Sequence, residues 1–217
     1  MSRSYIAFLI LVFAVIACKI PGLSGGGGGG VTGTSKGTAT GGSDPKADIV
    51  EASKKFIALP SFTANMEGVG QTDIKSQVAY VAPDRFHVRY LGGTGAGMEL
   101  IYIGSDSYMK SGDKWTKSPG SGNIPNLRDS FTEAGLKTLT DAKYEGDDTV
   151  DGKSASVYSY KNVTPVGSFP FTSKMWVSND TGVPMKIYAE YPNGALKHMT
   201  VNYDTESKVT IEPPNIK

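Results

Sequence analysis

The feature that most constrains the fold of this 217-residue chain is a two-residue alternation of apolar and polar side chains after Pro60. Phe62, Ala64 and Met66 are separated by polar residues, and the same spacing recurs in residues 74–80 and 85–90. Every second side chain of a β-strand points to the same face, so this spacing predicts strands with one apolar face. Stretches rich in Gly, Pro, Asp and Ser separate the segments. The pattern therefore predicts an antiparallel meander.

Helical spacing appears in two places. Asp44 is a good N-cap and Pro45 is tolerated in a first turn, so the apolar positions that follow predict an amphipathic helix over residues 46–58. Residues 124–140 predict a second, short helix, broken or capped near Gly135. The predicted strands are 62–67, 74–80, 85–90, 98–103, 107–110, 141–145, 155–161, 173–178, 183–191 and 196–203, with a short last segment at 208–212.

The number of strands sets the expected architecture. An antiparallel sheet of about ten strands must curl, and its concave face then needs a cover. Two helices are available to cover it. We therefore expect an α+β fold, mainly antiparallel β, in which a curved half-open β-barrel carries a helical lid.

The N-terminus has the pattern of an exported protein. An apolar run from Tyr5 to Ala17 follows Arg3 and is shorter than the roughly 20 residues of a membrane-spanning helix. It predicts a signal peptide over residues 1–17. The sequence Val15-Ile16-Ala17-Cys18 resembles the lipobox of bacterial lipoproteins, which implies that Cys18 becomes a lipidated N-terminus. The alternative is a signal-segment cysteine in an ordinary secreted protein.

Residues 18–44 have the composition of a flexible linker. They contain an unbroken glycine run from Gly25 to Gly30, then mostly Gly, Ser and Thr. Such a segment has little to bury in return for the entropy that ordering would cost. As a coil from Lys19 to Asp44 it would have a root-mean-square reach of about 26–31 Å. We expect residues 45–217 to form one folded domain on the end of this tether.

Composition excludes several kinds of function. The net charge is +1, so there is no electrostatic case for nucleic-acid binding. Cys18 is the only cysteine, so the folded domain has neither a disulfide nor a cysteine metal site. We expect no cofactor and no enzymatic activity.

Three short patterns could carry chemistry. Asp180-Thr181-Gly182 matches the catalytic triplet of aspartic proteases, but that mechanism needs two carboxylates and the chain has one copy, so a turn is the other interpretation. The glycine-rich segment 92–97 lies between two predicted strands, which favours a hairpin loop over a nucleotide loop. His87 and His198, the only histidines, fall on polar strand faces, where solvated histidine is favoured over metal ligation.

Parts of the domain also resemble a known family. The segments SFTANMEGVG, IKSQVAYVAPDRFHVRY and MELIYIGSDSYMKSGDKWTK resemble the superfamily of periplasmic lipoprotein carriers and outer-membrane lipoprotein receptors (LolA/LolB-like), nearest its lipid-binding lipoprotein relatives. The C-terminal SKMWVSNDTGVPMKIYAEY resembles the family's strand–turn–strand. The positions that carry the resemblance are Pro83, Arg85, Phe86, Gly104, Tyr108, Trp115, Trp176, Gly182, Pro184 and Lys186.

The resemblance implies an unclosed antiparallel barrel with a helical lid over an apolar cavity, and binding of acyl chains or lipoproteins without covalent chemistry. Cys18 favours a receptor-like or lipid-binding member. We expect a monomer whose partners are a lipid or an acylated protein, and a membrane through the lipid anchor. The expected cavity residues are Phe62, Met66, Val78, Tyr80, Phe86, Val88, Leu100 and Tyr102, with Phe131 and Leu136 as lid.

Two questions stay open at this stage. The same fold could serve as a protein-interaction or sensor module with a filled core and no ligand. The location should be the cell envelope, and because Lys19 rather than Asp follows the cysteine, the outer membrane facing the periplasm is favoured if the cell has two membranes.

Overall fold

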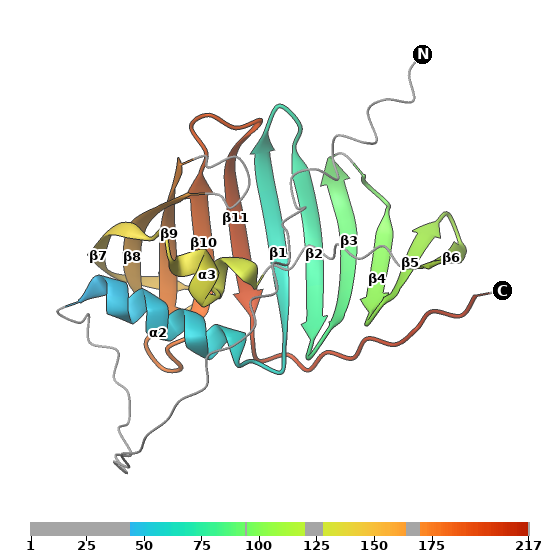
Figure 1. Cartoon of the computed structure of the whole chain (residues 1–217), viewed down its shortest axis with the longest axis horizontal. Helices are drawn as coiled ribbons and strands as arrows, with labels where there is room; N and C mark the ends of the chain where they lie inside the picture. The colour runs from blue at the N-terminus through green and yellow to red at the C-terminus, as the bar shows by residue number, and fades with distance from the viewer. Residues whose placement is uncertain (1–43, 94, 120–127, 164–169, 217) are drawn as a thin grey trace, which may run out of the picture.

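One curved antiparallel sheet dominates the computed structural model, with the helices on one of its faces (Figure 1). The structure describes residues 44–93, 95–119, 128–163 and 170–216. The strands in these ranges are β1 (Ser61–Gly70), β2 (Ile74–Val81), β3 (Arg85–Gly93), β4 (Glu99–Ile103), β5 (Asp106–Ser111), β6 (Lys114–Pro119), β7 (Thr140–Val150), β8 (Lys153–Val163), β9 (Pro170–Ser178), β10 (Pro184–Glu190) and β11 (Leu196–Asp204).

The sheet is open. Its order is β6-β5-β4-β3-β2-β1-β11-β10-β9-β8-β7, and every pair of neighbours is antiparallel. The first and last strands of this order, β6 and β7, are the two edges. The predicted curved, half-open barrel with few helices is confirmed.

Helix α2 (Pro45–Ile57) begins where the sequence predicts. The Asp44 side chain accepts hydrogen bonds from the backbone N–H groups of Lys46 and Ala47, both at 3.1 Å. Such a cap satisfies donors that have no partner within the helix. The buried side of the helix, formed by Ile49, Ala52, Ser53 and Phe56, faces the sheet. The predicted range 46–58 differs from the observed range by one residue at each end.

The second predicted helix is short and interrupted in its described part, but the interruption lies at Thr132 and not near Gly135. Residues 128–140 hold two short pieces, η2 (Asp129–Phe131) and α3 (Glu133–Leu136). Thr132 between them is extended, and its hydroxyl accepts a hydrogen bond from the Gly135 N–H, which starts α3 anew. Residues 124–127 of the prediction lie outside the described residues.

One further prediction needs correction at the far end of the sheet. Strand β6 was not expected, and it completes the β5–β6 hairpin. The short last segment at 208–212 is not part of the sheet. It crosses the face of the sheet opposite to the helices, where Ile211 is buried against Ile101 and Tyr108. Arg85 donates a hydrogen bond to the Ile211 carbonyl at 2.7 Å and so holds the segment in place.

Several predictions concern residues that the structure does not describe. The signal peptide over residues 1–17, the lipidated Cys18 and the linker as far as residue 43 are among them, and they stay predictions. None of the helices within the described ranges is long and apolar enough to span a bilayer.

Candidate functional site

The candidate site is the concave face of the sheet. The sheet register aligns Phe62 with Tyr80, Tyr80 with Phe86, and Phe86 with Tyr102. In the neighbouring row across the strands, Ala64 is aligned with Val78, Val78 with Val88, and Val88 with Leu100. Met66 lies two residues beyond Ala64, so all eight strand residues of the predicted cavity share one face. Phe131 on η2 and Leu136 on α3 belong to the same apolar cluster.

The part of this face beneath α2 is filled by aromatic rings. Phe56 is fully buried, and its ring centroid lies 4.8 Å from that of Phe62, 4.4 Å from Phe131 and 4.8 Å from Tyr203. The series continues along the sheet from Phe62 to Tyr80 at 5.2 Å and from Tyr80 to Phe86 at 5.0 Å. Rings at such separations are in contact. These side chains form a packed core.

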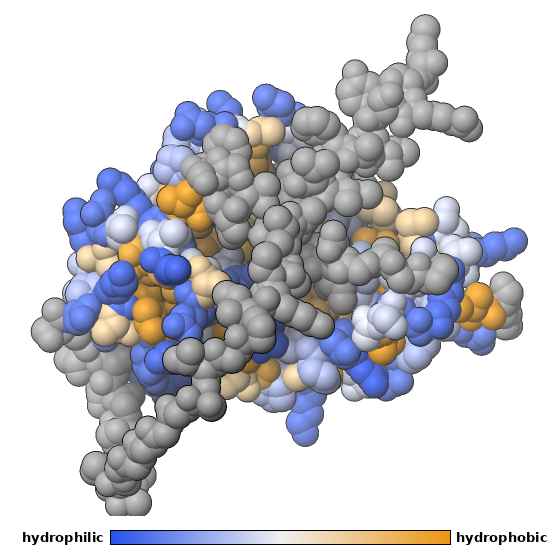
Figure 2. Space-filling model, in the orientation of Figure 1, coloured by the Kyte–Doolittle hydropathy of each residue, from blue (hydrophilic) through white to orange (hydrophobic). Residues whose placement is uncertain are grey.

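The part of this face on β3 and β4 is different. Val88, Leu100 and Tyr102 are only partly buried, and Met109 on β5 is 45% exposed. The described helices lie over the other half of the sheet, from β7 to β11, and none of them lies in front of β3–β6 (Figure 1). In Figure 2, hydrophobic residues show between hydrophilic ones on the helical half of this face. Because Val88, Leu100, Tyr102 and Met109 keep part of their surface exposed, apolar surface continues beyond the region that the described helices cover.

Two tyrosines add polar groups to this partly exposed surface. Burial raises the pKa of Tyr90, and burial together with the nearby Tyr90 raises the pKa of Tyr102. Both hydroxyls therefore stay neutral at ordinary pH and can both donate and accept hydrogen bonds. Neutral hydroxyls beside aliphatic side chains suit a ligand that is mainly apolar and carries a few uncharged polar atoms.

Arg128 connects several elements at the edge of this packed core, and nothing in the sequence pattern singled it out. Its guanidinium lies over the Tyr80 ring, 4.6 Å from the centroid. It donates hydrogen bonds to the Tyr80 hydroxyl and to the Ile57 carbonyl at the end of α2. This one side chain joins η2, β2 and α2. It is recognisable as a structural residue only once these elements are assembled.

The two predicted lid residues are held firmly. Phe131 and Leu136 are 3% and 7% exposed. The Asn162 side chain on β8 donates a hydrogen bond to the Gly135 carbonyl at 2.9 Å and so anchors α3 to the sheet. The Lys46 side chain of α2 donates a hydrogen bond at 3.0 Å to the carbonyl of Leu139, the residue before β7. Both helices are therefore held at the end of the sheet that β7 and β8 form.

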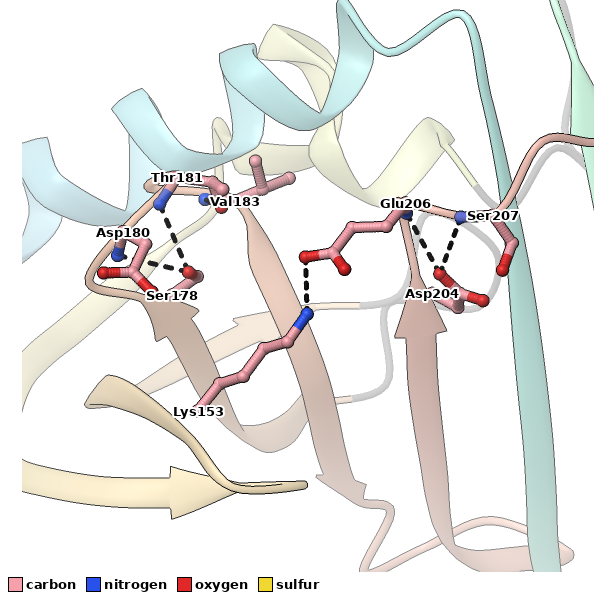
Figure 3. Close-up of polar contacts among 8 residues, drawn as sticks. All are labelled: Lys153, Ser178, Asp180, Thr181, Val183, Asp204, Glu206 and Ser207. Atoms are coloured by element: carbon pink, nitrogen blue, oxygen red, sulfur yellow. Dashed lines mark hydrogen bonds and ion pairs between the residues drawn. The ribbon is translucent and has the colours of Figure 1, made fainter.

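The Asp-Thr-Gly triplet forms the turn between β9 and β10. The Ser178 hydroxyl accepts hydrogen bonds from the N–H groups of Asp180 at 3.3 Å and Thr181 at 3.2 Å. Figure 3 shows Asp180 and Asp204 on opposite sides of the Lys153–Glu206 pair. Hydrogen bonds from Ser207 and Glu206 lower the pKa of Asp204, so this carboxylate is not a proton donor at ordinary pH. The geometry favours a turn over a protease dyad.

The other two patterns also have structural explanations. The segment after β3 turns back into β4, and the Gly97 N–H donates to the Tyr90 carbonyl at 2.9 Å, as in a hairpin. His87 is partly buried and its Nε2 lies 2.6 Å from a Glu99 carboxylate oxygen. Among the described residues, no group of three or more His, Cys, Asp or Glu is placed to hold a metal ion.

Comparisons with known proteins agree with this fold. No protein-family model matches the chain, and no curated protein matches it. Among solved structures, the Mycobacterium tuberculosis lipoprotein LppX is 16% identical, with 80% of this chain and 98% of that chain covered and a TM-score of 0.52. LprF from Mycobacterium bovis is 13% identical, with 78% and 96% covered and a TM-score of 0.60.

At these identities the likeness concerns the fold. The predicted LolA-like lipoprotein-carrier fold is confirmed at that level. Both solved chains are covered almost completely, and about four fifths of this chain takes part in each match.

Proposed function

We propose that this protein is a lipid-anchored lipoprotein of the cell envelope that binds an acyl chain of a lipid or of an acylated protein, without covalent chemistry. The observation that carries the proposal is the apolar concave surface on β3 and β4, where Val88, Leu100 and Tyr102 remain partly exposed. Contiguous apolar surface that stays exposed is one of the features by which binding sites are recognised. LppX, which shares the fold, is itself named a lipoprotein.

The ten predicted site residues have two roles in this proposal. Val88, Leu100 and Tyr102 contact the chain directly. The other seven, which are buried, form the wall against which it lies: Phe62, Met66, Val78, Tyr80, Phe86, Phe131 and Leu136. Burial of a methylene group contributes about 0.8 kcal/mol, so a long chain can bind without a charged partner. Tyr90 and Tyr102 supply neutral hydrogen bonds to its polar end.

The anchor and the location complete the proposal. Cys18 carries the lipid, the linker over residues 19–44 lets the domain move relative to the membrane, and the domain works as a monomer. In a cell with two membranes, Lys19 favours the outer membrane, with the domain facing the periplasm. Cys18→Ser should abolish incorporation of labelled palmitate and release the protein from membranes. If the variant still incorporated palmitate and still stayed with membranes, the proposed lipid anchor at Cys18 would be refuted.

The ligand site is tested by native mass spectrometry of the full chain in detergent, followed by organic extraction. A co-purifying acyl lipid is expected. Val88→Arg places a charge on the partly exposed surface and should lower the affinity for a fluorescent fatty acid at least tenfold. Asn65→Arg, the same charge on the exposed opposite face of β1, should change it less than twofold. Equal effects of the two changes would count against the site.

A second function is favoured by one observation, the packed rings beneath α2. If the core is filled throughout, the domain is a protein-interaction or sensor module of the envelope. Purification without lipid and no binding of the fatty-acid probe would favour this alternative.

A further inference from the structure

The face of the sheet opposite to the helices holds two neighbouring hollows, of about 440 and 450 Å³. Thr172 on β9 lines both of them. The other residues around the first hollow are Tyr188, Glu190, Tyr191, Pro192, Lys197 and His198, and those around the second are Asp141, Ala142, Lys143, Ser159, Tyr160 and Lys161.

The sheet register places the two hollows in one line. Lys161 is aligned with Thr172, Thr172 with Glu190, and Glu190 with His198. Their chain neighbours Ser173, Ala189 and Tyr160 are buried on the helical side, so this row points the other way. Asp141 extends the row to β7 through an ion pair with Lys161 at 3.0 Å. A row that crosses five strands is about 19 Å long, because neighbouring strands lie about 4.8 Å apart.

The chemistry of this outer groove is polar with one aromatic part. The rings of Tyr188 and His198 lie 5.7 Å apart, and the Tyr188 hydroxyl donates to the Glu190 carboxylate at 2.9 Å. Hydroxyls come from Thr172 and Ser159. The cations Lys143, Lys161 and Lys197 are nearly balanced by the two carboxylates of Asp141 and Glu190. A nucleic acid would need a clear excess of cations, and an acyl chain would need an apolar lining.

We propose that this outer groove binds an extended glycan strand of low net charge, lying across β7–β11. A sugar ring has an apolar C–H face that packs on an aromatic side chain, and hydroxyls that both donate and accept hydrogen bonds. The groove offers both kinds of partner along a straight path. A peptide would be expected to need an apolar anchor pocket, and the lining of the groove is mainly polar.

This inference is independent of the proposed acyl-chain site. The groove shares no residue with that site and lies on the other face of the sheet. An envelope protein with both sites would hold a lipid on one face and a glycan on the other. Loss of one activity would leave the other intact.

The experiment is calorimetric titration of the full chain in detergent with three soluble tetrasaccharides: the uncharged chitotetraose and maltotetraose, and an anionic hyaluronan tetrasaccharide that should bind more weakly than the tighter of the other two. Thr172→Arg places a long side chain where the two hollows meet, and Tyr188→Ala removes the ring. Each should weaken binding of the tightest of the three at least tenfold. Thr149→Arg, an equally exposed strand position outside the groove, should change it less than twofold. Unchanged urea-unfolding midpoints establish that the variants are folded.

Three results would overturn the proposal. The first is no binding of any tetrasaccharide by the unmodified chain at millimolar concentration. The second is binding that Thr172→Arg leaves unchanged, which would place the sugar elsewhere. The third is saturable binding of an unstructured Lys- and Glu-containing peptide that Thr172→Arg abolishes while no sugar binds, which would make the groove a peptide site.

Discussion

At the scale of single residues, Glu99 makes a testable contribution to stability. Its carboxylate accepts hydrogen bonds from His87 at 2.6 Å and from Lys110 at 3.2 Å. Partial burial alone would raise the pKa of Glu99, but these two neighbours outweigh it and hold the pKa below its ordinary value of 4.5. A carboxyl group whose pKa is lower in the folded state stabilises the fold above the unfolded-state pKa and loses that effect as the pH falls through the folded-state pKa.

Glu99→Gln should therefore lower the free energy of unfolding by up to about 1 kcal/mol at pH 7. The difference from the unmodified protein should shrink as the pH falls below 4.5 towards 3. Urea unfolding at a series of pH values measures it, and Glu51→Gln on the exposed side of α2 controls for the loss of one charge. A difference that stays constant from pH 7 to pH 3 would contradict the assigned role.

The same residues show how far the sequence alone can be interpreted at this scale. Along the regular stretches of the strands, alternation predicted which face a residue occupies, because side-chain direction there depends on position in the strand alone. It did not predict that His87 pairs with Glu99, since that contact depends on the register between β3 and β4. The role of Arg128 could not be predicted either, because its hydrogen-bond partners lie 48 and 71 residues away in the chain.

At the scale of elements, the β9–β10 turn requires glycine. Gly182 has φ +70°, and a β-carbon there would lie 2.5 Å from the Lys55 side-chain nitrogen on α2. Gly182→Ala should cost about 1–2 kcal/mol of stability, because L-residues are strained in the left-handed region. The Lys55 side chain can move aside, so backbone strain and not the clash should set the cost. The loss of stability in the double variant Lys55→Ala/Gly182→Ala should therefore equal about the sum of the losses in the two single variants. Full recovery of stability in the double variant would show that the clash, not the backbone, sets the cost.

Elements with a strong pattern were predicted and elements with a weak one were not. Helix α2 has a cap, an apolar side and a terminating proline, and its range was predicted within one residue. Strand β6 reads Lys-Trp-Thr-Lys-Ser-Pro, a mostly polar edge strand without alternation of its own. The helical spacing of residues 124–140 did not reveal that Thr132 is extended, because the Thr132 hydroxyl can cap a new helix there.

At the scale of the whole molecule, the fold class followed from counting strands against helices. The division of the concave face into a packed part beneath α2 and a partly exposed part on β3 and β4 did not. It depends on where the helices are anchored, and the anchors are Lys46 to the Leu139 carbonyl and Asn162 to the Gly135 carbonyl. Neither hydrogen bond has a sequence signature, so the predicted cavity residues were treated as one set.

An open sheet also leaves two edges that the molecule must protect from association. The β7 edge is irregular, with bulges on either side of Lys143–Tyr144 and left-handed backbone at Asp141. The β6 edge carries the exposed cations Lys114 and Lys117, and Lys117 is paired with Asp106 at 2.7 Å. Charged side chains, lysine above all, and bulges are the usual means by which proteins keep free strand edges from pairing with another chain.

The protein should accordingly be a monomer whose monomeric state depends on these lysines. Lys114→Ile/Lys117→Ile should produce dimers and larger species, because it leaves a β-prone edge without charge. Lys174→Ile/Lys208→Ile removes the same charge from exposed positions away from both edges and should leave the monomer intact. Sedimentation velocity of the full chain in detergent distinguishes the outcomes. Equal association of the two double variants would attribute the effect to added hydrophobic surface instead of the β6 edge.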